Sequence, residues 1–273
     1  MTPLADRCLA FRHLHESGCF VVPNPWDLGS ARLLVLLGFP ALATTSSGFA
    51  WSLGRSDNGV PLETTLDHFR ALAEGVEVPV NGDFTSGFAV EPEGVAGNVA
   101  AACRTGVAGL SIEDSTGDEA EPLFPFGLAV ERVRAAREAI DASGSGVLLT
   151  GRSEGFIAGR PDLGETLRRL VAYSEAGADC LYAPGLRKEE EIRAAVDAVA
   201  PKPLNVLVGS DFTVAVLAEL GVRRISVGGA LARAAWAAFL AAAREIAEDG
   251  PFTALAGAVP FAEIDGAFGR PQP

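Results

Sequence analysis

Three charged residues stand at the ends of consecutive apolar segments and could together perform chemistry. Asp83 follows VPVNG, Glu113 ends AGLSIE, and Arg152 follows GVLLTG. Two carboxylates that face one small volume repel each other, so they require a cation, a proton or an arginine between them. A hard divalent ion, Mg²⁺ or else Mn²⁺, suits two carboxylates because it keeps open positions for water and substrate. The pattern therefore predicts a metal site at Asp83 and Glu113, with Arg152 as a planar fork for a substrate carboxylate.

Plainer interpretations of the same residues stay open. An aspartate at the end of a strand is more often a helix cap than a metal ligand. Arg152 could be the ion-pair partner of Glu113 and nothing more. The occurrence of all three residues on consecutive strands favours the metal site.

The elements that must position these residues are short apolar runs in alternation with helical patterns. The expected strands are Cys19–Pro23, Ala41–Thr45, Val78–Gly82, Ala108–Glu113, Gly146–Gly151, Asp179–Ala183, Pro203–Leu207 and Arg224–Val227. The expected helices are Leu28–Leu37, Leu62–Glu74, Gly94–Arg104, Ala129–Ala142, Leu163–Ala176, Lys188–Val199, Thr213–Leu220 and Leu231–Glu248. Met1–Ser17 is expected as a helix that closes the bottom, and Gly250–Pro273 as a wrapping tail.

Eight strand–helix units predict an α/β fold, a (β/α)8 TIM-type barrel that spans residues 1–273 as one domain, since such barrels need about 250 residues. Several strands begin after a glycine that ends the preceding helix, as in GVAGLSIE and GADCLYAP, which is typical of parallel strands. A doubly wound sheet is the alternative. In a barrel the working residues sit at the carboxyl ends of the strands, so Asp83, Glu113 and Arg152 should lie side by side.

Other polar residues are expected at the same end of the barrel. Trp26, Thr45, Ser46, Ser47, Gly48, Asp57 and Asn205 are there, and with Glu113 and Arg152 they are the candidates for substrate binding or catalysis. His13, His15 and His68 fall on predicted helices away from the mouth, so a histidine base or ligand is not expected. The acidic segment Glu113–Glu121 is expected to be a solvated surface loop.

Composition excludes several classes of partner. A formal net charge of −13 disfavours nucleic acid and anionic membrane surfaces, which require basic patches. The four cysteines are scattered and no transmembrane or secretory segment is evident, which favours the cytoplasm. The final helix, ALARAAWAAFLAAAREIA, is apolar almost all round, so it must be covered either by the barrel or by another subunit.

The chain resembles the isocitrate lyase/phosphoenolpyruvate mutase superfamily in six runs that occur in order between Pro23 and Gly229. They are NPWDLGSARLLVLLGFPALATTSSGFAWSLG, VPVNGDFTSGFA, GVAGLSIEDSTG, LLTGRSEGF, EAGADCLYAPG and KPLNVLVG. The resemblance implies a Mg²⁺-dependent enzyme that makes or breaks C–C or C–P bonds of 2-oxo acids or their enol forms. It also implies homodimers or homotetramers whose barrels exchange their eighth helix.

The resemblance further implies roles position by position. Asp83 matches the direct metal ligand, with Gly87 in support of the register, and Glu113 matches the acid that holds the metal through water. Arg152 matches the arginine that binds the substrate carboxylate, and Asp57 the acid of the strand 2 loop. Thr45, Ser46, Ser47 and Gly48 match the loop around the substrate's carboxylate end, and Asn205 a strand 7 asparagine near the substrate.

Two departures from the superfamily narrow the expected function. The second acid of the family's Asp-x-Asp pair is Thr85 in this chain. The segment STGDEAEPLFPFG lacks the Lys-Lys/Arg-Cys-Gly-His motif of isocitrate and methylisocitrate lyases, and the lysine and asparagine of the mutases and phosphonopyruvate hydrolases. We therefore expect a Mg²⁺-dependent carbon–carbon lyase or decarboxylase for a small 2-oxo dicarboxylic acid such as oxaloacetate, acting through a metal-stabilised enolate. The alternatives are a phosphonopyruvate-type C–P hydrolase or mutase, and a 2-oxo acid binding protein without turnover.

Overall fold

The apolar runs of the chain form short parallel strands, because both faces of a parallel sheet are buried and accept near-continuous apolar sequence. The computed structural model describes residues 2–248, 250 and 252–269. Its strands are β1 (Phe20–Val22), β2 (Leu42–Ala43), β3 (Val80–Asp83), β4 (Gly109–Glu113), β5 (Leu148–Arg152), β6 (Cys180–Tyr182), β7 (Leu204–Leu207) and β8 (Arg224–Ser226). Each overlaps its predicted segment, and β3 and β5 run one residue further, so that Asp83 and Arg152 are the last residues of their strands.

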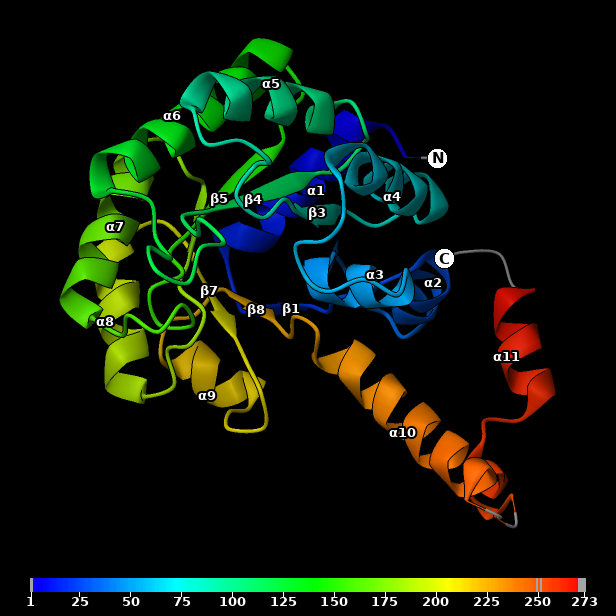
Figure 1. Ribbon diagram of the computed structural model, residues 1–273. Coiled ribbons are helices and arrows are strands. Elements are labelled where there is room, and N and C mark those ends of the chain that lie inside the picture. Colours follow the sequence, from blue (N-terminus) through cyan, green and yellow to red (C-terminus); the bar gives the residue numbers. More distant parts are fainter. Residues whose placement is uncertain (1, 249, 251, 270–273) are drawn as a thin grey trace.

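The strands form one parallel sheet in the order β1-β8-β7-β6-β5-β4-β3-β2. Only the seam between β1 and β2 is not a strand pair, and two hydrogen bonds cross it. The Ala43 amide donates to the Pro23 carbonyl at 3.1 Å, and Asn24 Nδ2 donates to the Thr44 carbonyl at 2.8 Å. The sheet is therefore a nearly closed (β/α)8 barrel with helices outside it (Figure 1), as predicted, and the doubly wound alternative is wrong.

Helices follow the strands and cover the outside of the barrel (Figure 1). They are α1 (Leu4–Glu16), α2 (Leu28–Leu36), α3 (Ser46–Ser52), α4 (Leu62–Gly75), α5 (Pro92–Cys103), α6 (Phe126–Ser143), α7 (Leu163–Glu175), α8 (Glu189–Val199), α9 (Val214–Glu219), α10 (Ala230–Ala247) and α11 (Phe261–Phe268), with a 3₁₀ helix η1 (Thr253–Gly257). Three of these were not predicted: α3 directly after β2, and η1 and α11 in the expected tail Gly250–Pro273. Residue 1 of the expected first helix and residues 251 and 270–273 of that tail lie outside the described residues.

Helix α3 begins at a corner that its own side chains stabilise. Thr45 is the N-cap residue, and its Oγ1 accepts a hydrogen bond from the Gly48 amide at 3.3 Å. A hydroxyl in this position satisfies one of the amides that the first helical turn leaves free. The segment Thr45–Gly48, which the sequence suggested as a loop, is therefore the first turn of a short helix at the mouth of the barrel.

The interior of the barrel is unusually polar at its lower end, where α1 closes it. Phe11 on α1 is fully buried, and His15 faces the strands. Arg224 of β8 lies in this interior, where its Nη1 is 3.4 Å from His15 Nε2. Its other two nitrogens donate to Asn205 Oδ1 at 2.9 Å and Thr150 Oγ1 at 3.0 Å. A network of neutral side chains thus surrounds a buried guanidinium below the mouth.

Helix α10 does not pack on the barrel along its length. In Figure 1 it projects away from the strands, and α11 returns toward α2. Ala232 is its one buried residue, whereas Trp236, Phe239 and Leu240 are exposed. Cover by the chain's own barrel, one of the two explanations for this apolar helix, is therefore wrong, and cover by another subunit stays a prediction. No helix in the described part of the chain is long and apolar enough to cross a membrane.

The barrel wall leaves no room for a side chain at Gly82 of β3. A Cβ atom at this position would lie 2.5 Å from Phe69 Cε2 and 3.0 Å from Leu110 Cδ2. We predict that Gly82→Ala lowers the free energy of unfolding by about 1–3 kcal/mol, because overpacking forces both neighbours to move. Gly97→Ala is the matched control: Gly97 is exposed in α5 with nothing within 4 Å, so the change should stabilise the protein by about 0.5–1 kcal/mol. Urea unfolding of both variants measures the difference, and equal stabilities would contradict the close packing.

Candidate active site

The centre of the candidate site is the guanidinium of Arg152, to which carboxylates from neighbouring strands converge. Its Nη1 lies 3.4 Å from Asp83 Oδ1 and 3.3 Å from Glu113 Oε2. Its Nε donates to Glu154. The strand register explains the first two contacts, since Glu113 pairs with Arg152 across β4 and β5, and β3 lies next to β4. Three carboxylates around one guanidinium leave an excess of negative charge.

The pKa of the Glu113 carboxyl group reflects both its burial and the neighbouring charges. This side chain is buried, and loss of water raises the pKa of its carboxyl group well above the usual value. Arg152 opposes the shift, and the neighbouring carboxylates of Glu154 and Asp83 add to it. A proton or a further cation is needed to compensate carboxylates placed in this way.

A divalent cation fits the donors that the site offers. Asp83 and Glu113 are oxygen donors on adjacent strands that approach the same nitrogen of Arg152, so one small volume lies between them. Among the described residues no group of three or more His, Cys, Asp or Glu side chains is placed so that it could hold a metal ion. Mg²⁺ is commonly held by one or two carboxylates and keeps water on its other positions, so this sparse set suits Mg²⁺ or Mn²⁺. The plainer contacts are present as well, since Asp83 also accepts the amide of Ser46 at the start of α3 and Arg152 pairs with Glu113.

A second set of buried groups holds Arg152 in place from behind. The side chain of Glu154 binds Arg152, and its backbone is fixed by Asp114. The Glu154 amide donates a hydrogen bond to Asp114 Oδ1 at 2.7 Å. Asp114 Oδ2 in turn accepts from Tyr173 Oη at 2.6 Å and from Arg169 Nη1 at 3.0 Å. The prediction of a solvated loop from residue 113 is therefore wrong for its first two residues, Glu113 and Asp114, which are buried. Their partner cations on β5 and α7 are distant in sequence, so no local pattern indicates the burial.

The corner between β2 and α3 lies beside Asp83. The Ser46 amide donates to Asp83 Oδ2 at 3.1 Å, and the Ser46 side chain also hydrogen-bonds to Asp57. Ser47 Oγ lies 3.2 Å from Thr45 Oγ1. Thr45, Ser46, Ser47, Asp57, Asp83, Arg152 and Asn205 line one cavity of about 180 Å³. The structure thus brings together most of the residues for which the sequence predicted substrate contact.

Two of the predicted substrate residues lie behind this cavity and do not line it. Gly48 is buried in the first turn of α3. A Cβ atom on Gly48 would come within 3.1 Å of Trp26 Cβ, so Trp26 packs against the back of that turn. The Trp26 amide donates to Ser30 Oγ at 3.1 Å. Trp26 is therefore placed to support the corner, and its contact with a substrate stays a prediction.

The floor of the cavity contains Asn205, for which the sequence predicted substrate contact, and also Ser111, Arg224 and Ser226, which the sequence analysis did not single out. Asn205 is buried with both ends of its amide in use, since Nδ2 donates to Ser226 Oγ at 2.9 Å and Oδ1 accepts from Arg224. Tyr182 stands between Arg152 and Asn205 in the strand register, and the Arg152 Cζ atom is 5.1 Å from its ring centroid. Burial raises the pKa of Tyr182 to about 12. The signal for Ser111, Arg224 and Ser226 was available, because polar side chains recur at alternate positions of β3, β4, β5 and β8, and alternate residues face one side.

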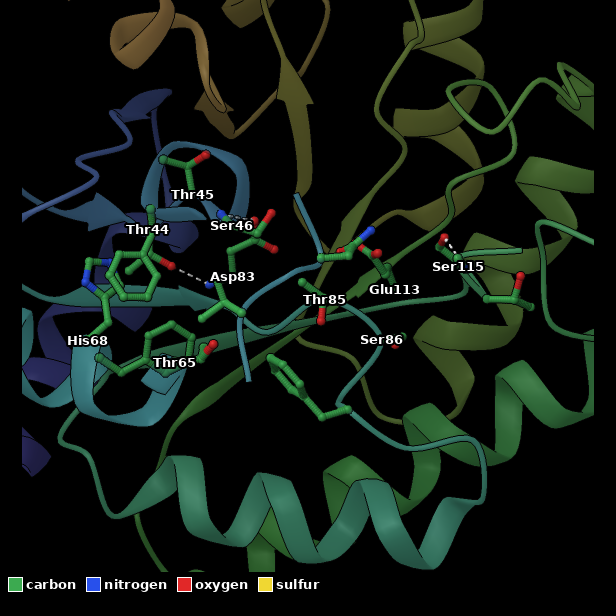
Figure 2. A pocket seen from close by; sticks show the side chains of 17 residues that line it. Thr44, Thr45, Ser46, Thr65, His68, Asp83, Thr85, Ser86, Glu113 and Ser115 are labelled. Atoms are coloured by element: carbon green, nitrogen blue, oxygen red, sulfur yellow. Dashed lines mark hydrogen bonds between the residues drawn. The ribbon is translucent and has the colours of Figure 1, made fainter. Parts of the chain in front are cut away.

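A second cavity, of about 160 Å³, lies on the other side of Asp83. Figure 2 shows Thr44, Thr65 and His68 on one side of Asp83, and Thr85, Glu113 and Ser115 on the other. The placement of His68 away from the mouth is therefore wrong: it is buried in the wall of this cavity and stacks on Phe49 with 3.7 Å between ring centroids. The reason is that α4 begins at the mouth, so its first turns face the site. Burial lowers the pKa of His68 to about 4.

The turn after β3 has an unusual backbone. Thr85 has a φ of 47° and Phe88 a φ of 56°, both in the left-handed region, with Gly87 at 74° between them. A β-branched residue such as threonine is rarely found there, and the conformation costs of the order of 1–3 kcal/mol. The Thr85 carbonyl accepts the amide of Glu113 at 2.9 Å, so the turn is tied to one of the two candidate metal ligands.

Comparison with known proteins gives a consistent result. A sequence profile of the family described as phosphoenolpyruvate phosphomutase matches residues 11–247. An oxaloacetate decarboxylase of Paraburkholderia xenovorans is 30% identical over 239 residues, which cover 84% of this chain and 77% of that protein.

Two solved structures are also similar to the whole chain. A Burkholderia cenocepacia protein, provisionally assigned as a lyase/mutase, has a TM-score of 0.95 at 45% identity and covers 98% of each chain. An oxaloacetate acetylhydrolase in complex with its product oxalate has a TM-score of 0.87 at 27% identity, with 98% of this chain and 96% of that chain covered.

The buried histidines predict a loss of stability in acid. Each has a pKa below its unfolded value of about 6.5, about 4 for His68 and about 3 for His15, so it binds a proton only after unfolding. The stability that these neutral histidines contribute is therefore fully present above pH 6.5 and is lost as the pH falls below it. We expect His68→Phe, which keeps the ring stack with Phe49, to lose roughly 2 kcal/mol less than the wild type between pH 7 and pH 5. Urea unfolding at both pH values measures this, with the exposed His13→Gln as control; equal losses in all three proteins would contradict the burial of a neutral His68.

The strained turn predicts one effect on stability and another on metal binding, and two variants separate them. Asparagine and aspartate tolerate the left-handed region better than threonine, so Thr85→Asn and Thr85→Asp should each stabilise the protein by about 1 kcal/mol in the presence of metal. Only Thr85→Asp adds a carboxylate beside Asp83 and Glu113, so it alone should tighten Mn²⁺ binding, by about tenfold or more. Calorimetric titration with Mn²⁺ and urea unfolding check the pair. The same Mn²⁺ affinity in both variants would place the metal elsewhere.

Proposed function

The chain belongs to the phosphoenolpyruvate phosphomutase family, within the phosphoenolpyruvate mutase/isocitrate lyase superfamily of enzymes, and from that premise we propose that it is a Mg²⁺-dependent carbon–carbon lyase or decarboxylase. Its substrate is a small 2-oxo dicarboxylic acid, with oxaloacetate as the first to test. The observation that carries the proposal is the approach of Asp83 and Glu113 to the same nitrogen of Arg152 beside a cavity of substrate size.

Arg152 keeps one nitrogen, Nη2, with which it could bind a carboxylate of the substrate. Nε and Nη1 are used by Glu154, Asp83 and Glu113, while Nη2 has no hydrogen bond to any described residue, and the side chain lines the cavity. A carboxylate of the substrate would pair with Nη2, and the hydroxyls of Ser46 and Ser47 would contact its other end. Because Glu154 fixes the guanidinium plane, the substrate is held in one orientation.

The chemistry then requires that the bond to the distal carboxylate breaks and that a proton replaces it. A divalent ion at Asp83 and Glu113, when bound, supplies positive charge to the 2-oxo group as negative charge develops there. The electron pair of the broken C3–C4 bond enters the 2-oxo acid, carbon dioxide leaves, and C3 takes up a proton. Tyr182 lines the cavity and is protonated at neutral pH, so its hydroxyl group is the first candidate for the proton donor. Asp57, which lines the same cavity beside Ser46, is the second candidate.

The loop after β4 supports decarboxylation over the other reactions of the superfamily. Its first residues, Ser115, Thr116 and Gly117, line the second cavity, and a bridge between Ser115 and Leu123 holds its two ends together. The loop contains neither cysteine, lysine nor histidine, and cleavage of oxaloacetate to pyruvate and carbon dioxide needs none of them. Relatives named oxaloacetate decarboxylase and oxaloacetate acetylhydrolase support the same substrate class.

We also propose that the protein forms a homodimer or homotetramer through α10. This helix projects from the barrel with Trp236, Phe239 and Leu240 exposed. Monomeric proteins rarely expose contiguous apolar patches of this kind. A second copy of the chain that covers α10 would account for its composition.

The test of the function is a metal-dependent product. We expect the metal-stripped protein to convert oxaloacetate to pyruvate when Mg²⁺ is added, as followed by proton NMR against the uncatalysed background. Asp83→Asn should lose activity by at least about a hundredfold, because it removes one of two charges that hold the ion. Asp67→Asn, an exposed acid on α4 that pairs with Arg70, is the matched control and should stay at the wild-type rate.

Other products would redirect the assignment. Oxalate with acetate would indicate hydrolytic C–C cleavage. Phosphate release from phosphonopyruvate, without turnover of oxaloacetate, would indicate a C–P hydrolase. Thermal stabilisation by 2-oxo acids without any product would indicate a binding protein.

A further inference from the structure

The cavity beside Asp83 continues the cavity that the proposed function uses for the substrate. The two share Thr44, Thr45, Ser46 and Asp83 in their walls, so they meet at the Asp83 carboxylate. The proposed reaction uses the first, of about 180 Å³, for the 2-oxo acid. Of the second, of about 160 Å³, that reaction uses only Glu113 besides the shared residues.

The far end of the second cavity is apolar and uncharged. Phe49, Val60, Phe69 and Phe88 contribute hydrocarbon to its walls. His68 completes this part of the wall, and its ring lies flat on Phe49 at an angle of 10°. The imidazole is neutral at physiological pH because burial lowers its pKa to about 4. The far end therefore offers no charge to hold an anion.

The hydroxyl groups at this end are already used by the protein. Thr44 Oγ1 accepts the Asp83 amide at 2.7 Å, and Thr65 Oγ1 donates to the Pro61 carbonyl at 3.3 Å. In Figure 2 both threonines lie on the same side of Asp83 as His68, whereas the acid Glu113 lies on the other. The cavity is thus divided into a charged end near the candidate metal ligands and a hydrocarbon end behind Asp83.

We propose that the hydrocarbon end is a binding site for an uncharged alkyl or aryl substituent on carbon 3 of the 2-oxo acid. This inference rests on the proposed function, which binds the 2-oxo acid in the first cavity, and that cavity meets the second at Asp83. A cavity of about 150 Å³ with hydrocarbon walls holds a benzene molecule, and the hydrocarbon end is one part of a cavity of about 160 Å³, so a group of about three carbon atoms fits. The physiological substrate then carries such a group, and unsubstituted oxaloacetate fills only one of the two cavities.

The reaction of such a substrate balances in the same way as that of oxaloacetate. In 3-propyl-oxaloacetate the C3–C4 bond breaks, carbon dioxide leaves, and its electron pair stays on C3. The proton that C3 takes up yields 2-oxohexanoate. The propyl group is a bystander throughout, so it contributes through binding in the cavity.

The experiment compares propyl-substituted with unsubstituted molecules in the Mg²⁺-loaded protein. We expect kcat/KM to be about tenfold or more higher for 3-propyl-oxaloacetate than for oxaloacetate, since a buried methylene group contributes to discrimination at about this scale. Calorimetric titration with the products, which needs no turnover, should show 2-oxohexanoate bound about tenfold or more tighter than pyruvate.

Variants assign the preference to this cavity. Val60→Phe fills it and should bring both preferences to near one, the kcat/KM ratio of 3-propyl-oxaloacetate to oxaloacetate and the affinity ratio of 2-oxohexanoate to pyruvate. The kcat/KM for oxaloacetate and the affinity for pyruvate should stay within about twofold of the wild-type values. Val90→Phe adds the same bulk at an exposed position outside the cavity and should leave both ratios unchanged. Phe49→Ala enlarges the cavity and should move the optimum to longer chains, which keeps the test decisive if Val60→Phe does not fold.

The outcomes separate this inference from the proposed function. Turnover of oxaloacetate without a propyl preference in wild type would overturn the inference and leave the function intact. A propyl preference in binding that Val60→Phe abolishes, without turnover of either acid, would support the cavity and overturn the function. A preference that persists in Val60→Phe and does not shift in Phe49→Ala would overturn the inference, because the alkyl group would then bind elsewhere.

Discussion

Charged groups inside a barrel must find opposite charge within a few ångströms, because the surrounding protein solvates them poorly. Arg152 meets this requirement for Asp83, Glu113 and Glu154 at once, and each of these carboxylates is delivered by a strand end or the residues that follow it. The arrangement depends on strand register: a slip of one residue in β4 would turn Glu113 toward the helices. The barrel, the site and the need for a further cation therefore follow from the same set of distances.

The lower interior of the barrel holds a buried charge of the other sign, which is solvated by neutral polar groups. Arg224 is buried, and its hydrogen bonds go to Asn205, Thr150 and His15, none of which is a carboxylate. His15 Nδ1 lies 2.7 Å from the Phe11 carbonyl, which places its proton there and leaves Nε2 free to accept from Arg224. A positive charge on the floor thus faces the excess of negative charge at the mouth. The polar residues between them lie in the electric field of these two sets of charges.

Sequence patterns were sufficient for the barrel and for the centre of the site, because both follow local rules. Apolar runs and helix-ending glycines located every strand, and the rule that strand ends share one mouth brought Asp83, Glu113 and Arg152 together. The same rules could not place His68, whose position depends on the direction in which α4 leaves the mouth. They also could not show that Asp114 is buried, since its partners lie on α7. A helix as short as α3 depends on one capping hydroxyl and has too few residues for a visible period.

The first residues of the projecting helix α10 touch the corner that contacts the substrate in the proposed reaction. A Cβ atom at Gly229 would lie 2.8 Å from Ser47 Oγ and 3.2 Å from the Trp51 ring, and one at Gly48 would lie 3.3 Å from Ala232 Cβ. The root of α10 and the start of α3 are therefore packed as one unit, with no space for one to shift alone. Because thermodynamic linkage is reciprocal, a contact that displaces α10 changes ligand affinity at that corner by the same factor by which the ligand changes the contact. In an oligomer held through α10, subunit contact and substrate binding would therefore be coupled through the packing of α10 on α3.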